Sequence, residues 1–434
     1  MSDVMIGIVG IVAVLVLFLT GIELAFAMAL VGFVGFGVLT SFSVATNMLA
    51  KDYFDVFSSY GLTVVALFVL MGEVAFNAGL ARRMYSAAYK FVGHIPGGLA
   101  MATVAGATAF KAICGSSPAT AATFASVAVP EMDRYGYAKK LSTGIVASVG
   151  TLGILIPPSV VLILYGVITE VSIGRLFLAG IIPGLIVAFF FVVIIYGWCK
   201  INPAIGPRGG RSGWGERMRS LPDLAWILII FLLVIGGLME GFFTPTEAGS
   251  VGTIGVLVLS LLKRDIGLKG FGKSLISSVR TASMVLMLIA GSTVLGHFLA
   301  ATEIPMITAD WVVSLPFNHY LIMFFICLIY LLGGSFVDDL AFMVLATPIF
   351  YPAIGKLGFD PIWFGMIICV TVMIGVVIPP VAINVFVVKN ITKVPFGVIY
   401  SGVYPFVISL VVAGALLFLF PQLSLWLPRV LIGR

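Results

Sequence analysis

Two stretches of this sequence, residues 153–158 (Gly-Ile-Leu-Ile-Pro-Pro) and 375–380 (Gly-Val-Val-Ile-Pro-Pro), place a proline pair inside a long apolar run. Each pair removes two backbone donors and forces the preceding residue out of helical geometry, so a helix must break there. The break leaves carbonyl oxygens without partners, and such oxygens are suitable ligands for a hard monovalent cation such as sodium. The sequence therefore predicts two cation sites built largely from backbone oxygens.

Two further apolar stretches, about 92–130 and 318–354, are interrupted in the middle by small or polar residues. We interpret them as re-entrant hairpins, each entering and leaving the membrane on one face, whose tips complete the cation sites. The predicted ligands are Gly115, Ser116, Gly150, Gly153 and Pro157 for the first site, and Gly333, Gly334, Ser335, Thr371, Gly375 and Pro379 for the second.

The half-helices that follow the breaks offer N-terminal amides to a substrate carboxylate. Asp338 and Asp339 lie in apolar sequence, where a charge is costly enough to suggest a function; we expect one to face water and the other to cap a hairpin arm. The predicted substrate-binding residues are Ser116, Ser117, Thr120, Ser159, Ser335, Asp338 and Asn384. For each residue alone, helix packing or a core hydrogen bond is the competing explanation.

Membrane-spanning helices must position these residues. The 434 residues are 61% hydrophobic and 10% charged, with a mean hydropathy of +1.20, and apolar runs reach the length of about 20 residues that a spanning helix needs. This pattern favours an all-α polytopic membrane protein over a β-barrel. Spans are expected near 4–20, 22–40, 61–80, 141–170, 175–199, 222–243, 247–263, 281–301, 360–392 and 397–421.

The distribution of Lys and Arg predicts the topology. With the hairpins re-entrant, most basic residues of the connections fall on one side, which the positive-inside rule makes cytoplasmic. Both termini then face outward, and Lys111, inside the first hairpin, is left out of this comparison. The net charge of +6 therefore indicates membrane topology, and nucleic acid is not an expected partner. The basic segment 201–220 is a cytoplasmic connection, with anionic-lipid binding as an alternative.

The two halves of the chain form a repeat. Shifting the first half by 222 residues (130 to 352) superposes Pro130 on Pro352 and residues 153, 157 and 158 on 375, 379 and 380. Each half has an odd number of full spans, so the second copy is inverted. The first repeat covers 1–200, with a scaffold part at 1–60 and a transport part at 61–200. The second covers 221–434, with scaffold spans at 221–263, an amphipathic connection at 264–280 and a transport part at 281–434.

Several segments together form a family pattern: 115–117 with 119–120, 156–159 with 164–166, 244–248, and 359–361 with 375–380. In these segments the chain closely resembles the large membrane subunit of the tripartite ATP-independent periplasmic (TRAP) transporters, with Pro118 as a departure from the pattern. The resemblance implies a sodium-coupled importer of organic acids such as sialic acid or dicarboxylates, with an elevator mechanism in the bacterial inner membrane. It also implies a periplasmic solute-binding protein and a separate small four-helix membrane subunit as partners.

Three alternatives stay open on the sequence. One is a stand-alone sodium-coupled dicarboxylate carrier that needs no binding protein. Another is an intramembrane enzyme that uses Asp338 and Asp339 as an acid pair. A passive channel is disfavoured, because hairpin tips that meet broken helices suit an occluded site better than an open pore. No nucleotide-binding or hydrolase motif occurs in the sequence, so neither ATP hydrolysis nor other catalysis is expected.

Overall fold

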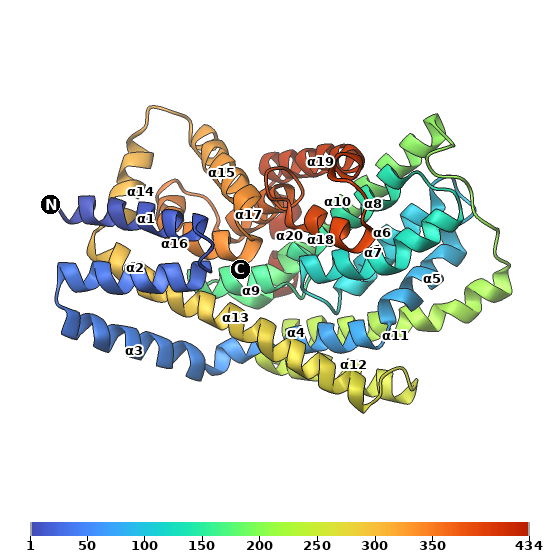
Figure 1. Ribbon diagram of the computed structural model, residues 1–434, viewed down its shortest axis with the longest axis horizontal. Helices are drawn as coiled ribbons and strands as arrows, with labels where there is room; N and C mark the ends of the chain where they lie inside the picture. The colour runs from blue at the N-terminus through green and yellow to red at the C-terminus, as the bar shows by residue number, and fades with distance from the viewer. Residues whose placement is uncertain (1, 433–434) are drawn as a thin grey trace.

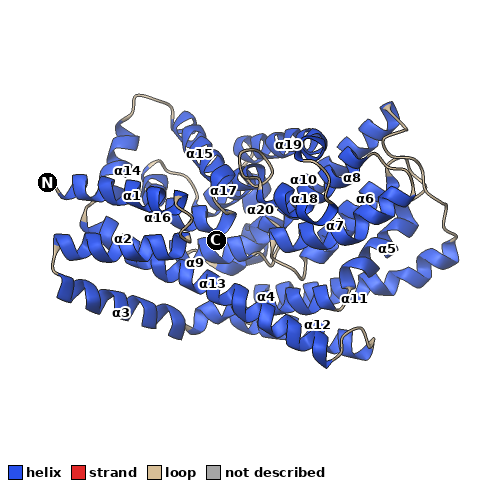
Figure 2. Ribbon diagram, in the orientation of Figure 1, coloured by secondary structure: helices blue, strands red, loops and turns tan. Residues whose placement is uncertain are grey.

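The computed structural model describes residues 2–432, and within that range it consists of helices and their connections, without strands (Figure 2). Seven helical segments of the described part are long and apolar enough to cross a bilayer by length and composition. The all-α polytopic membrane fold predicted from the composition is therefore confirmed.

The chain begins with a layer of helices that lie side by side at the lower left of Figure 1. The helix α2 packs against α1, α3 and the long α13, and α4 packs against α12 and α13. The bounds of the helices before the first hairpin are α1 Asp3–Leu19, α2 Leu24–Leu39, α3 Phe42–Ser58, α4 Thr63–Asn77 and α5 Leu80–Val92.

The first hairpin and the first broken helix follow. The hairpin consists of α6 (Gly98–Lys111) and α7 (Ser117–Arg134). The broken helix consists of α8 (Lys139–Gly150), a short 3-10 turn and α9 (Val160–Thr169). The chain then crosses to the second half through α10 (Ile173–Ile201), α11 (Trp214–Met239), α12 (Pro245–Leu262) and α13 (Leu268–Ala301).

The second half repeats this plan. After α14 (Ile304–Ser314), α15 (His319–Phe336) and α16 (Asp339–Lys356) form the second hairpin. The second broken helix consists of α17 (Pro361–Gly375) and α18 (Ile383–Thr392), and α19 (Phe396–Leu419) and α20 (Gln422–Ile432) complete the described chain. Both helices therefore break at the proline pairs, as the sequence predicts.

The repeat is accurate at the level of single residues. The return arm α7 spans residues 117–134 and its counterpart α16 spans 339–356, a displacement of 222 at both ends. In Figure 1 the first hairpin lies to the right of the centre and the second to the left, so the two approach the middle of the molecule from opposite ends.

Several helices differ from the expected spans. The sequence predicts an amphipathic connection followed by a separate span in the region where α13 runs without interruption over 34 residues. The helix is continuous because no proline removes a backbone donor between residues 268 and 301. The helices α3, α5, α14 and α20 were not anticipated. Polar residues such as Lys51 and Asp52 interrupt the apolar run of α3, and a search for continuous apolar stretches misses a helix of this kind.

Candidate functional site

The first hairpin tip is the short turn between Lys111 and Ser117. Ser116 is the N-cap of α7, and its hydroxyl accepts a hydrogen bond from the Ala119 amide at 3.4 Å. Pro118 lies in the first turn of α7, where a missing N–H leaves no intrahelical bond unmade. The proline that departs from the family pattern is thus compatible with the start of this helix.

The second tip begins its return arm at the equivalent point. Asp338 occupies the N-cap position of α16 without a side-chain cap bond, and the Asp339 carboxylate accepts the Leu340 amide at 3.0 Å. Ser116 and Asp338 thus hold equivalent places in the two halves, and so do Ser117 and Asp339.

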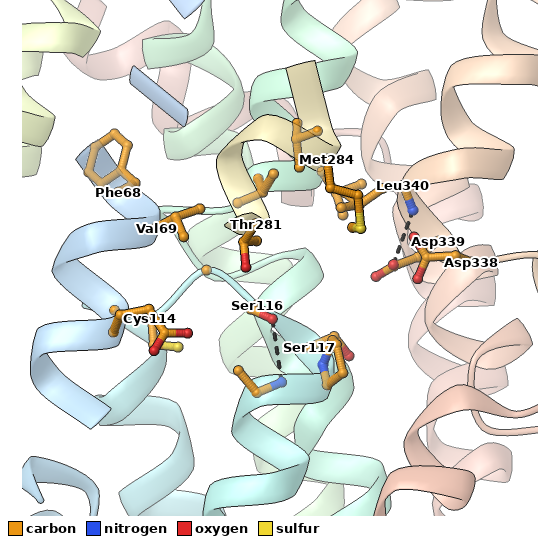
Figure 3. A pocket seen from close by; sticks show the side chains of 18 of the residues that line it. Phe68, Val69, Cys114, Ser116, Ser117, Thr281, Met284, Asp338, Asp339 and Leu340 are labelled. Carbon is orange, nitrogen blue, oxygen red and sulfur yellow. Dashed lines mark hydrogen bonds between the residues drawn. The ribbon is translucent and has the colours of Figure 1, made fainter. Parts of the chain in front are cut away.

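Both tips line one cavity of about 270 Å³ (Figure 3). The first tip contributes Gly115, Ser116 and Ser117, and the second tip contributes Asp338 and Asp339. The remaining walls come from the start of α9 and from α4 and α13, including Phe68, Gly72, Glu73, Val160, Thr281 and Met284. Four of the predicted site residues, Gly115, Ser116, Ser117 and Asp338, therefore lie around one space.

Each tip packs closely on the break of its own half. A Cβ atom on Gly115 would lie 2.7 Å from the carbonyl oxygen of Pro158, and one on Gly375 would lie 2.7 Å from the carbonyl carbon of Gly334. The Val381 amide also donates to the Ser335 carbonyl at 3.1 Å. Glycine at these positions permits backbone approaches that any side chain would obstruct.

Asn384 links the two halves. Although it follows the second break, its buried side chain is hydrogen-bonded to the Ser117 hydroxyl of the first tip, with amide nitrogen to oxygen at 3.0 Å. The same amide donates to the Ala147 carbonyl on α8 at 3.2 Å. Gly150 lies against this amide, so the site residue Gly150 provides room for it.

The other predicted polar site residues do not line the cavity. Each bonds to a backbone carbonyl of its own segment: Thr120 to Ser116 at 3.1 Å, Ser159 to Ile154 at 2.8 Å, Ser335 to Leu332 at 2.7 Å and Thr371 to Ile367 at 2.9 Å. The peptide bonds that join the paired prolines, at Pro157 and Pro379, are both cis. Gly333 packs on the Phe342 ring and Gly334 on Val372.

The two breaks differ in exposure. Residues 151–160 of the first break are all buried, whereas Pro379, Pro380 and Val381 of the second are exposed at the molecular surface. Ala382 completes the second break with a positive φ of 50°.

Lys111 is the residue that the sequence interpretation left without a role. It is fully buried, and its ammonium donates to the Ser116 carbonyl at 2.6 Å. Its alkyl chain and ammonium fill the position that a Cβ atom on Gly153 would take. A lysine within an apolar run is itself a sign of function, because an intramembrane charge is costly. Glu73 and Thr281 were also missed, since they come from helices far from the tips in sequence.

Two hairpin tips that meet broken helices around a cavity, in an all-helical membrane protein, define a membrane transporter. Comparison with known proteins gives the family. Residues 11–423 match the family model described as "Tripartite ATP-independent periplasmic transporter, DctM component". The chain therefore belongs to the TRAP transporter family as its large membrane component, and the interpretation as an intramembrane enzyme is ruled out.

Two relatives show how much of the chain the similarity covers. The chain is 36% identical to the C4-dicarboxylate TRAP transporter large permease protein DctM of Pseudomonas aeruginosa, over 89% of this chain and 90% of that protein. It is 32% identical to the sialic acid TRAP transporter large permease protein SiaM of Vibrio cholerae, over 96% and 97%. Among solved structures, the YdaH transporter of Alcanivorax borkumensis shares the fold, with a TM-score of 0.68 at 14% identity over 89% of this chain and 90% of that one.

Proposed function

We propose that this chain is the membrane permease subunit of a sodium-coupled importer of organic acids in the bacterial inner membrane, with both termini in the periplasm. The observation that carries the proposal is the cavity lined by both hairpin tips, one with hydroxyl groups and the other with two carboxylates. The relatives named for C4-dicarboxylates and for sialic acid support a carboxylate as the transported group.

The charges around the cavity suggest why substrate and sodium would move together. Asp338 and Asp339 repel an anionic substrate across a small space, unless a cation lies between them and the substrate. The N-terminal amides of α7, at Ser116 and Ser117, offer a favourable place for the substrate carboxylate. Substrate and cation would then each bind more tightly in the presence of the other, which is the thermodynamic basis of symport.

Packing supports an elevator mechanism. The helices α4 and α13 form part of the cavity wall, and they pack mainly on each other and on α2, α3 and α12. The contact between α13 and the hairpin arm α16 is smaller. We assign α4 and α13 to the scaffold, although the sequence alone places α4 and residues 281–301 of α13 in the transport parts. We assign the hairpins with the broken helices to a moving transport domain. The small spacing between tips and breaks favours movement of that domain as one body, because closely packed interiors do not deform continuously.

The partners follow from the tripartite family. A periplasmic solute-binding protein would deliver the organic acid, and a small four-helix membrane subunit would complete the scaffold. The test is reconstitution of the chain with these two partners in proteoliposomes, followed by uptake of a panel of radiolabelled organic acids. We expect uptake that requires an inward sodium gradient, the binding protein and the small subunit. Uptake by the chain alone would indicate a stand-alone carrier, and uptake without sodium would overturn the coupling.

A further inference from the structure

Lys111 lies where the sequence places the first sodium site. Two of the residues predicted to coordinate that ion, Ser116 and Gly153, flank the Lys111 ammonium. The Ser116 carbonyl accepts bonds from the lysine at 2.6 Å and from the Thr120 hydroxyl at 3.1 Å. A backbone oxygen expected to coordinate sodium thus already has a cation as its partner.

The surroundings of Lys111 offset part of the cost of burying a positive charge. Lys111 is the last residue of α6, where the carbonyl ends of a helix attract a cation. Asp339 of the second tip is close enough for its charge to act on the ammonium. Burial of a lone ammonium is strongly unfavourable, so these compensating groups are what hold it there.

The position equivalent to Lys111 in the second half carries no lysine. The displacement of 222 that superposes α7 on α16 places Gly333 opposite Lys111, and the Phe342 ring packs over that glycine. The charges of the second tip are the carboxylates of Asp338 and Asp339. The second break is also exposed at Pro379 and Pro380, whereas the first break is buried, so the proline pair of the second break reaches the molecular surface and that of the first does not.

We propose that the Lys111 ammonium is a resident cation of the first half, which holds the first tip against the first break in place of a sodium ion, so that sodium couples to transport through the second half. This inference rests on the proposed sodium-coupled function. With both carboxylates ionised, the two tips carry one positive and two negative charges, and Glu73 of α4 adds a third carboxyl group to the same cavity wall. A further monovalent cation on the side of the second tip would offset this negative charge. A second cation beside the ammonium would face direct repulsion.

The test removes the charge of Lys111 and counts sodium ions. Lys111→Gln retains a donor for the Ser116 carbonyl, and Lys111→Met removes both the charge and the donor. Each variant, in complex with the small subunit, is compared with the native complex in two measurements. One is the dependence of thermal stability on sodium concentration. The slope of stability against the logarithm of that concentration gives the number of sodium ions bound. The other is the reversal potential of substrate flux in proteoliposomes, which reports the ions coupled.

We expect both variants to bind and couple about one more sodium ion than the native complex, because an emptied cation site becomes available. Lys269→Gln removes the charge of an exposed lysine on α13 and should leave both measurements unchanged. If the native complex shows no dependence on sodium, the proposed function itself fails. If the native complex depends on sodium and the Lys111 variants keep its slope and reversal potential, only the resident-cation role is overturned.

A third measurement uses the native protein, so it does not depend on the variants folding. Crystals of the complex soaked in thallium(I), a monovalent cation with a strong anomalous signal, should show density at the second tip and break. The first half should show none beside the ammonium. A thallium peak between Ser116 and Gly153 in the native protein would overturn the proposal, because the site would then accept a free cation while Lys111 is present.

Discussion

The two hairpin tips share a backbone plan and differ in charge. Both return arms begin at equivalent residues, Ser117 and Asp339, and both tips pack against a break through a glycine. The first tip carries hydroxyl groups beside a buried ammonium, and the second carries two carboxylates beside an exposed break. The two tips therefore share a backbone geometry and carry charges of opposite sign. Four predictions test this contrast.

The largest effect is expected from removal of the acidic charges of the second tip. Asp338→Asn combined with Asp339→Asn should lower sodium-dependent uptake by about 100-fold or more, since a bond to a charged group contributes about 1.5–3 kcal/mol. Uptake rates under an imposed sodium gradient measure the loss, and sodium should no longer raise the melting temperature. The matched change in the first tip, Ser116→Ala with Ser117→Ala, should cost about tenfold and retain the sodium-induced shift. Equal losses of the sodium response would contradict the division of roles.

The next effect tests whether both tips must seat against their breaks. Gly115→Ala and Gly375→Ala each introduce a Cβ atom 2.7 Å from a backbone atom of the opposing segment. A shift of about 1 Å in a site can cost about 100-fold in rate, so each variant should lose about tenfold to 100-fold of its uptake. Gly197→Ala on α10 meets no atom within 4 Å and serves as the control. Native uptake by either tip variant would show that its tip does not need this contact.

A smaller effect concerns the link between the halves. Asn384→Ala leaves the buried Ser117 hydroxyl and the Ala147 carbonyl without this partner, which should cost about 1–3 kcal/mol of stability. The melting temperature should fall by a few degrees, and by less in Ser117→Ala, because the bond to Ala147 then remains. Ser401→Ala removes an exposed hydroxyl that donates to the Val398 carbonyl of its own helix and should have little effect. Equal shifts of the melting temperature in the Asn384 and Ser117 variants would show that the hydrogen bond to Ala147 does not contribute to stability.

The smallest effect is expected at the outer ends of the hairpins, away from the tips. Lys139 pairs with Asp133 next to the first hairpin, and Lys356 of the second pairs with Asp310, each at 2.5 Å and partly exposed. Exposed ion pairs contribute about 0–1 kcal/mol, so Asp133→Asn and Asp310→Asn should each shift the melting temperature slightly. Sodium coupling, measured by reversal potential, should stay the same in both. A changed sodium coupling in either variant would show that charges outside the two tips also affect ion binding.

The sequence predicts the broken helices, the hairpins and their repeat because local rules govern them. A proline pair removes donors wherever it occurs, and small residues interrupt an apolar run in a way that is visible along the chain. The interruption by small residues also predicts Gly115, Ser116 and Ser117, and the cost of a charge in apolar sequence predicts Asp338. The structure brings these four residues to one cavity. The amphipathic α3 and the uninterrupted α13 were missed, because continuous hydrophobicity is a poor guide to helices with polar faces.

The sequence by itself determined that this protein is an all-α membrane protein with a duplicated plan and two breaks, since composition and proline chemistry act locally. Only the tertiary structure decided which oxygens have partners. In the folded chain Asn384 bonds to the opposite half, and α4 and α13 form walls of the cavity. Lys111 lies between Ser116 and Gly153. The physical reason is that the cost of a buried charge or carbonyl depends on neighbours distant in the chain, and only packing brings those neighbours together.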